Sequence, residues 1–222
     1  MSFTSLFDPI FVSCERTDSN LFNEPLNLLS SAVFFLVAWL LWKDYKNNHQ
    51  KYDEERVTLI VLITLIGTGS IFFHAAANRL GMLLDTAPIA MFTAFVLYVS
   101  LRRLLGFKMM NTLLLLIGFA IACWLTQFIP DPYRFNESVA YVMPIAAIAI
   151  IACRLRQLHH ASAPYFLKAT LWFSVSLIFR SIDMIMCQTF PIGTHFLWHL
   201  CNGVALYFLA KAIRERRHTG RT

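Results

Sequence analysis

The sequence predicts an all-α membrane protein with seven transmembrane helices. Its 222 residues are 57% hydrophobic and 14% charged, with a mean hydropathy of +0.56, whereas a soluble domain carries about 25% charged residues. Seven apolar stretches are long enough to cross a hydrocarbon core of roughly 30 Å, which takes about 20 helical residues. They lie near residues 25–42, 57–77, 80–100, 109–129, 137–153, 164–182 and 192–213, and the first and fifth are short.

Positive charge alternates between the predicted connections. Fifteen of the 19 Lys and Arg residues fall in segments 43–56, 101–108 and 154–168 and in the tail from residue 211. Because Lys and Arg concentrate in cytoplasmic loops, the N-terminus is expected outside and the C-terminus in the cytoplasm. This distribution also accounts for the net charge of +6 without nucleic-acid binding, for which no motif is visible.

We expect one seven-helix membrane domain over residues 1–222, with an outer N-terminal segment at 1–24 and a basic cytoplasmic tail at 214–222. Segment 1–24 lacks a basic start followed by an apolar run, so the first span is expected to direct insertion. A bacterial inner membrane and a eukaryotic endomembrane both fit this pattern. The oligomeric state is not readable from it.

Three of the seven histidines lie inside predicted spans: His74 in the second, and His195 and His199 in the seventh. Ionisable groups in a bilayer are costly and usually face a bundle interior or a cavity. His195 and His199 are four residues apart, so they project from one helix face about 6 Å from each other. In the expected topology His74 reaches the same outer level. Since catalytic zinc often has three histidine ligands and an open position for water, we predict a zinc site here.

Ser70 and Asp85 are expected beside this site. Ser70 precedes His74 by four residues, and Asp85 follows a tight turn at 78–81 that reverses the chain. Asp85 could take a proton from an activated water and pass it to a leaving amine, and Ser70 could donate a hydrogen bond to the developing oxyanion. Alternatively, Asp85 orients a ligand imidazole, and Ser70 is a small packing residue between helices.

The complete pattern resembles the alkaline ceramidase family, part of a wider group of seven-helix membrane hydrolases that includes the adiponectin-type receptors. It consists of Ser70-x-x-x-His74 on the second span, Asp85 on the third and His195-x-x-x-His199 on the seventh. The resemblance covers essentially the whole chain. It implies that the three histidines bind zinc, that Asp85 transfers protons and that Ser70 stabilises the oxyanion. It further implies cleavage of ceramide into a sphingoid base and a fatty acid.

Segment 14–30 also resembles, less completely, an acidic segment that binds calcium in eukaryotic ceramidases. Glu15, Asp18 and Glu24 could supply oxygen ligands, but calcium takes six to eight. Glu24 could instead stabilise the start of the first helix through its charge. Asn27 and Ser30 continue the polar stripe into the membrane and are expected to form hydrogen bonds between helices.

Two residue pairs mark the outer end of the bundle. Arg180 and Asp183 are three residues apart in the sixth span, and we expect an ion pair between them. The alternative is that Arg180 contacts the head group of a substrate. Cys14 and Cys187 both fall on the expected outer side, where a disulfide could form, although the sequence does not show whether they are within reach.

We interpret the chain as an intramembrane zinc-dependent amidohydrolase for ceramide or a related N-acyl lipid that enters from the bilayer. Chain-length, head-group and amide-versus-ester preference depend on the shape of the pocket. The alternative is a receptor or sensor of seven helices with a structural zinc site. Ser70 and Asp85 favour the enzyme, because a structural three-histidine site needs neither. A proton pathway is a third hypothesis, but it predicts polar residues through the full bilayer depth.

Overall fold

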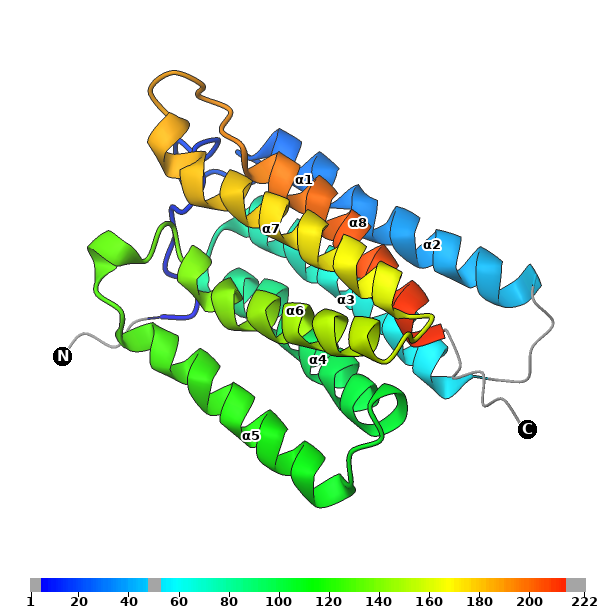
Figure 1. The fold of residues 1–222 in the computed structure, drawn as a ribbon. Helices are drawn as coiled ribbons and strands as arrows, with labels where there is room; N and C mark the ends of the chain where they lie inside the picture. Colours follow the sequence, from blue (N-terminus) through cyan, green and yellow to red (C-terminus); the bar gives the residue numbers. More distant parts are fainter. Residues whose placement is uncertain (1–4, 48–52, 215–222) are drawn as a thin grey trace, which may run out of the picture.

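The computed structural model describes residues 5–47 and 53–214, and within these ranges the chain is helical (Figure 1). Seven helical segments are long and apolar enough to cross a membrane. The prediction of an all-helical fold with seven spans is confirmed, and the protein is a multi-pass membrane protein. The orientation in the membrane stays a prediction. Most of the predicted basic tail, residues 215–222, and Lys51 lie outside the described residues.

The first span is broken into two helices, and the predicted spans that looked short are completed by neighbouring residues. The first and fifth spans run Pro25–Asn47 and Ser138–Gln157. The α-helices are α1 (Pro25–Ser30), α2 (Ala32–Asn47), α3 (Glu54–Ala76), α4 (Arg79–Val99), α5 (Met109–Leu125), α6 (Val142–Gln157), α7 (Ala163–Met186) and α8 (His195–Arg214). Short 3-10 or π turns are η1 (Ser100–Leu104), η2 (Thr126–Phe128), η3 (Asp131–Tyr133) and η4 (Ser138–Tyr141).

Helix α8 is the central helix of the bundle. It packs against α7, α2, α1 and α3, whereas α5 lies at the edge (Figure 1). In the apolar window of α8, 56% of the residues are buried, against 11% in α5. Side chains on α8 are therefore enclosed by protein rather than lipid, as polar groups at membrane depth require.

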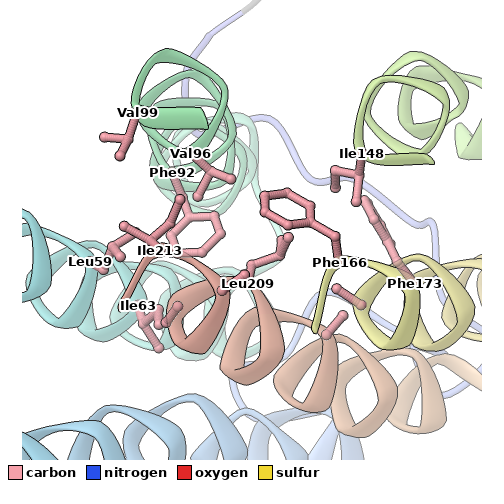
Figure 2. Close-up of a cluster of buried hydrophobic side chains, with 14 of the residues drawn as sticks. Leu59, Ile63, Phe92, Val96, Val99, Ile148, Phe166, Phe173, Leu209 and Ile213 are labelled. Atoms are coloured by element: carbon pink, nitrogen blue, oxygen red, sulfur yellow. The ribbon is translucent and has the colours of Figure 1, made fainter. Parts of the chain in front are cut away.

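Large apolar side chains fill the space between α3, α4, α7 and α8. Figure 2 shows Phe92, Phe166 and Leu209 close together there, with Leu59 and Ile213 beside them. All five are almost completely buried. Close packing of this kind fixes the spacing of the helices, because van der Waals contacts rather than expulsion of water hold membrane helices together. It sets the frame in which α3 and α8 present their polar residues.

The N-terminal segment covers the end of the bundle where α3 meets α4. The backbone N–H of Ile10 donates to the Ala77 carbonyl at 2.7 Å, and that of Phe22 donates to the Ala75 carbonyl at 3.0 Å. A disulfide joins Cys14 to Cys187 just beyond α7, with their Cα atoms 5.2 Å apart. This disulfide, which the sequence left open, ties the segment to the end of α7.

The expected ion pair between Arg180 and Asp183 does not form within the described residues. Asp183 is fully buried and accepts hydrogen bonds from the backbone N–H groups of Cys14 at 3.0 Å, Thr194 at 2.6 Å and His195 at 3.0 Å. Its carboxylate therefore satisfies orphan donors at the start of α8, where the helix dipole favours negative charge. Because these donors come from the N-terminal segment and from the start of the next helix, the spacing of Arg180 and Asp183 did not reveal them.

Gly69 allows α3 and α4 to approach closely. A Cβ atom at this position would overlap the carbonyl oxygen of Leu84 and lie 3.0 Å from the Cα of Asp85. Small residues permit this kind of backbone contact between membrane helices. The contact places the backbone of Asp85 against the turn of α3 that carries Ser70.

Replacing Gly69 with alanine is expected to lower the thermal midpoint of the detergent-purified protein. The added methyl group must push α4 away, a form of overpacking that costs about 1–3 kcal/mol. Gly118→Ala is the matched control, because a Cβ there meets nothing within 4 Å. Tryptophan fluorescence during heating measures both. Equal midpoints for Gly69→Ala and wild type would contradict the proposed contact.

Candidate metal centre

The structure brings together the three histidines that the sequence placed at one level. His74 comes from the last turns of α3, and His195 and His199 come from the first turns of α8. All three are buried, and one ring nitrogen from each lies within 4.8 Å of the others. Among the described residues, these three histidines form the one group of at least three His, Cys, Asp or Glu side chains that could hold a metal ion.

Glu24 fixes the proton position on His74. The Nδ1 atom of His74 lies 2.7 Å from Oε2 of Glu24. Burial acts to raise the pKa of the Glu24 carboxyl, but the hydrogen bond and charge of His74 and the hydrogen bonds from Arg16 and Asn27 lower that pKa to about 2. The carboxylate is thus ionised at neutral pH and can only accept, so Nδ1 donates. In the neutral imidazole, Nε2 then keeps a free lone pair.

Ser30 is the corresponding partner of His199. The Ser30 hydroxyl oxygen lies 2.7 Å from Nδ1 of His199, and this hydroxyl donates to the carbonyl of Asn27 at 2.9 Å. In the tautomer of His199 that leaves Nε2 free for a metal, Nδ1 donates to the Ser30 oxygen. The prediction that Ser30 bonds between helices is confirmed. With both Nδ1 atoms protonated, the Nε2 lone pairs of His74 and His199 face each other at 3.2 Å. Two ligands about 2.0–2.1 Å from one tetrahedral zinc ion lie about 3.4 Å apart, so the spacing fits a shared metal ion.

His195 provides a second observation that fits a metal site. Its Nδ1 atom is buried and has no hydrogen-bond partner among the described residues. The ring lies 5.1 Å from that of His74 and 4.9 Å from that of His199, measured between centroids. Buried polar atoms are rarely left without a partner. The donor set and this orphaned nitrogen both fit a metal ion held by neutral imidazoles.

Asp85 belongs to α4, is buried, and lies close enough to His74 to interact with it electrostatically. The charges of His74 and Arg180 act on its carboxyl. Within the described part of the chain it forms no hydrogen bond or ion pair. A buried carboxylate without fixed partners is costly, and such a group is available to a ligand or a proton.

Ser70 is fully buried one turn before His74. Its Oγ lies 2.9 Å from Oγ of Ser31, whose own hydroxyl donates to the Asn27 carbonyl at 2.9 Å. The packing interpretation of Ser70 therefore has a concrete partner. The same contact presents the hydroxyl to the interior of the bundle, between α1 and α3.

Arg180 approaches the centre from α7. Its guanidinium lies 5.3 Å from the ring centroid of Tyr141 and 5.0 Å from that of Trp198, both cation–π distances. Its Nε atom is buried without a hydrogen-bond partner in the described residues, and its charge acts on His195 and His199. Tyr141, which the sequence suggested only as an aromatic anchor at the membrane interface, belongs to no motif and reaches the site from η4, directly before α6.

An apolar cavity lies further along the bundle, separated from the histidines by Phe34. Phe34 lies at its wall and packs edge-on against His199, with centroids 5.9 Å apart. The cavity extends to Leu209, ten residues beyond His199 and thus about 15 Å further along α8. Its remaining lining comes mainly from α3, α4, α6 and α7. Polar groups in the lining include Tyr141 and Asn202.

The three carboxylates considered for calcium do not form a ligand set. Glu15 accepts from the backbone N–H groups of Leu26 and Asn27 at 2.7 and 2.9 Å. Asp18 accepts from the backbone of Asn20, and Glu24 bonds to Arg16, Asn27 and His74. Each carboxylate satisfies protein N–H donors, so these residues do not fit a calcium ion.

The comparison with known families agrees with this site. The model of the Ceramidase family matches residues 14–219, a range that contains all three histidines, Ser70 and Asp85. No curated protein matches the chain. With a match over most of its length, seven spans and a buried histidine cluster, the chain belongs to the ceramidase family.

Proposed function

We propose that this protein is a zinc-dependent amidohydrolase that cleaves the N-acyl amide of ceramide or a closely related lipid within the membrane. The observation that carries the proposal is the convergence of three buried histidines beside the Asp85 carboxylate, which is buried and unpaired among the described residues. Water adds its oxygen to the amide carbonyl carbon, and the C–N bond breaks. The products are a fatty acid and a sphingoid base or amine lipid.

His74, His195 and His199 are the proposed zinc ligands. When bound, zinc lowers the pKa of water and polarises a carbonyl oxygen. Asp85 is proposed to take the proton of the attacking water and to give it to the leaving nitrogen. Its lack of hydrogen-bonding partners in the described residues supports this role over a purely structural one, and so favours the enzyme over a receptor with a structural metal.

Ser70 is proposed to stabilise the oxyanion that develops on the carbonyl oxygen. To do so, its hydroxyl proton turns from Oγ of Ser31 toward the substrate, a rotation that leaves the serine side chain in place. Hydrogen bonds that strengthen as charge develops are worth more in a site that excludes water than in solution. The burial of Ser70 supplies that environment.

The apolar cavity is the proposed site for the acyl chain, because Phe34 in its wall packs against His199 and its lining continues along α8 to Leu209. Arg180 is proposed to contact the polar head of the substrate. Its guanidinium is held by two aromatic rings, and its Nε–H group has no hydrogen-bond partner in the part of the chain that the structure describes. The charge distribution predicts that the N-terminus is outside, and in that orientation we propose that the substrate is a lipid of the outer leaflet.

His199→Ala is expected to remove both zinc and amide hydrolysis. Wild-type protein purified in detergent is expected to hold about one zinc ion per chain, measured by mass spectrometry of the metal, and to release fatty acid from a fluorescent short-chain ceramide. His159→Ala is the matched control, since His159 is exposed beyond α6. Wild-type protein without zinc would contradict the site, whereas zinc without hydrolysis of any N-acyl lipid would contradict the proposed reaction.

Asp85→Asn is expected to retain zinc and lose activity. The amide side chain fills the same space but cannot take a proton, and general acid–base catalysis contributes about 10²- to 10⁴-fold in rate. Asp131→Asn serves as control, because the Asp131 side chain is 94% exposed. The turnover of Asp85→Asn, compared at equal zinc content, decides the matter. Unchanged turnover would exclude the proton-transfer role, and loss of zinc would assign Asp85 to orienting a ligand.

A further inference from the structure

Arg16 is the centre of a buried network that the proposed chemistry does not use. Its side chain is 1% exposed although it lies in the N-terminal segment, outside the seven spans. Nε donates to Oε1 of Glu24 at 2.6 Å, and NH2 donates to the backbone carbonyl of His74 at 2.9 Å. NH1 donates to the backbone carbonyls of Asp18 and Asn20 at 3.2 and 3.0 Å. Every nitrogen of the guanidinium thus has an acceptor.

The acceptors around Arg16 are those that would suit a metal cation. One carboxylate and three backbone carbonyls surround the guanidinium, and a hard ion such as calcium is bound by the same oxygen types. In this network the positive charge comes from the Arg16 side chain rather than from a bound metal ion. A buried carboxylate needs a counter-charge or hydrogen bonds, and Arg16 supplies both to Glu24.

The network reaches the metal centre through two separate contacts. Oε2 of Glu24 accepts from Nδ1 of His74, while Oε1 of the same carboxylate accepts from Arg16. Arg16 also holds the backbone carbonyl of His74 near the end of α3, where carbonyls lack partners within the helix. The Arg16 guanidinium therefore hydrogen-bonds both to the backbone of His74 and to Glu24, the carboxylate that accepts from the His74 ring.

We propose that Arg16 is a positioning residue of the metal centre, a built-in cation that orients Glu24 and through it His74, so that zinc binding does not require calcium. This inference rests on the proposed zinc site. Partners that orient a ligand imidazole typically affect metal affinity by about 10- to 100-fold. Lysine cannot replace the role completely, because a single ammonium group lacks the planar fork that serves all four acceptors at once.

The test compares zinc affinity, measured by competition with a fluorescent chelator, in wild type, Arg16→Ala, Arg16→Lys and Arg79→Ala. Arg79 is the matched control, because it is an exposed arginine at the same end of the bundle. We expect Arg16→Ala to bind zinc about 10- to 100-fold more weakly, Arg16→Lys to be intermediate, and Arg79→Ala to match wild type. Thermal midpoints of the metal-free proteins show that each variant is folded.

Chemical rescue separates positioning from general stabilisation. Millimolar guanidinium, well below denaturing concentrations, is expected to restore zinc affinity to Arg16→Ala and to leave wild type unchanged. Wild-type protein is expected to contain no stoichiometric calcium and to bind zinc equally with and without added calcium. If Arg16→Ala fails to fold, the comparison of Arg16→Lys with wild type decides the matter.

Equal zinc affinity of wild type and a folded Arg16 variant would overturn the inference, as would zinc binding by wild type that depends on calcium. Failure of the proposed zinc site gives a different pattern, in which wild type and Arg79→Ala also lack zinc, and this would remove the positioning role together with the site. Failure of the proposed reaction alone, with zinc bound but no hydrolysis, leaves the zinc affinities of the Arg16 variants as the test of this inference.

Discussion

Three imidazole lone pairs directed at one point inside a membrane protein are the constraint on which the rest of this structure depends. Neutral imidazoles offer ligand nitrogens, but lone pairs that face each other repel unless a cation lies between them. The arrangement at His74 and His199 is maintained from behind, where Glu24 and Ser30 accept the protons on Nδ1. Each metal-facing nitrogen is thus set by a hydrogen bond on the opposite side of its ring.

The end of the bundle that the N-terminal segment covers is built around this requirement. The N-terminal segment carries Arg16 and Glu24 to the end of α3, and the disulfide from Cys14 to Cys187 attaches it to α7. Asp183 then fixes the first turn of α8 through its backbone amides. Gly193 fits this junction, because a Cβ there would overlap the Asp183 carboxylate, and its positive φ of 65° suits glycine. The N-terminal segment, its disulfide and the junction of α7 with α8 therefore determine the geometry of the histidine cluster.

The sequence was sufficient to predict the features that depend on hydropathy over a whole span or on short spacings between residues. Hydropathy located the seven spans, and the spacing of His195 and His199 showed that both project from one helix face. The common depth of His74 followed from alternating span direction. Asp85 could be placed beside α3 because a tight turn joins α3 to α4, although only the structure reveals the backbone contact at Gly69 that brings them together.

The features that the sequence did not reveal are contacts between separate segments of the chain. Glu24 was considered for calcium or for the helix start, because nothing in its spacing shows that it meets His74, fifty residues later. The three donors to Asp183 come from Cys14 and from the start of α8, and they displaced the expected pair with Arg180. Local spacing predicts which residues share a helix face, but it does not predict which N–H group from another segment donates to a given carboxylate.

X-ray absorption at the zinc edge of the purified wild-type protein tests the central claim most directly. The account predicts three imidazole nitrogens at about 2.0–2.1 Å and one further light atom, the set of a catalytic site that keeps a position for water. A sulfur ligand, or a zinc signal that persists unchanged in His74→Ala, would contradict it, because the metal would then lie somewhere other than between α3 and α8.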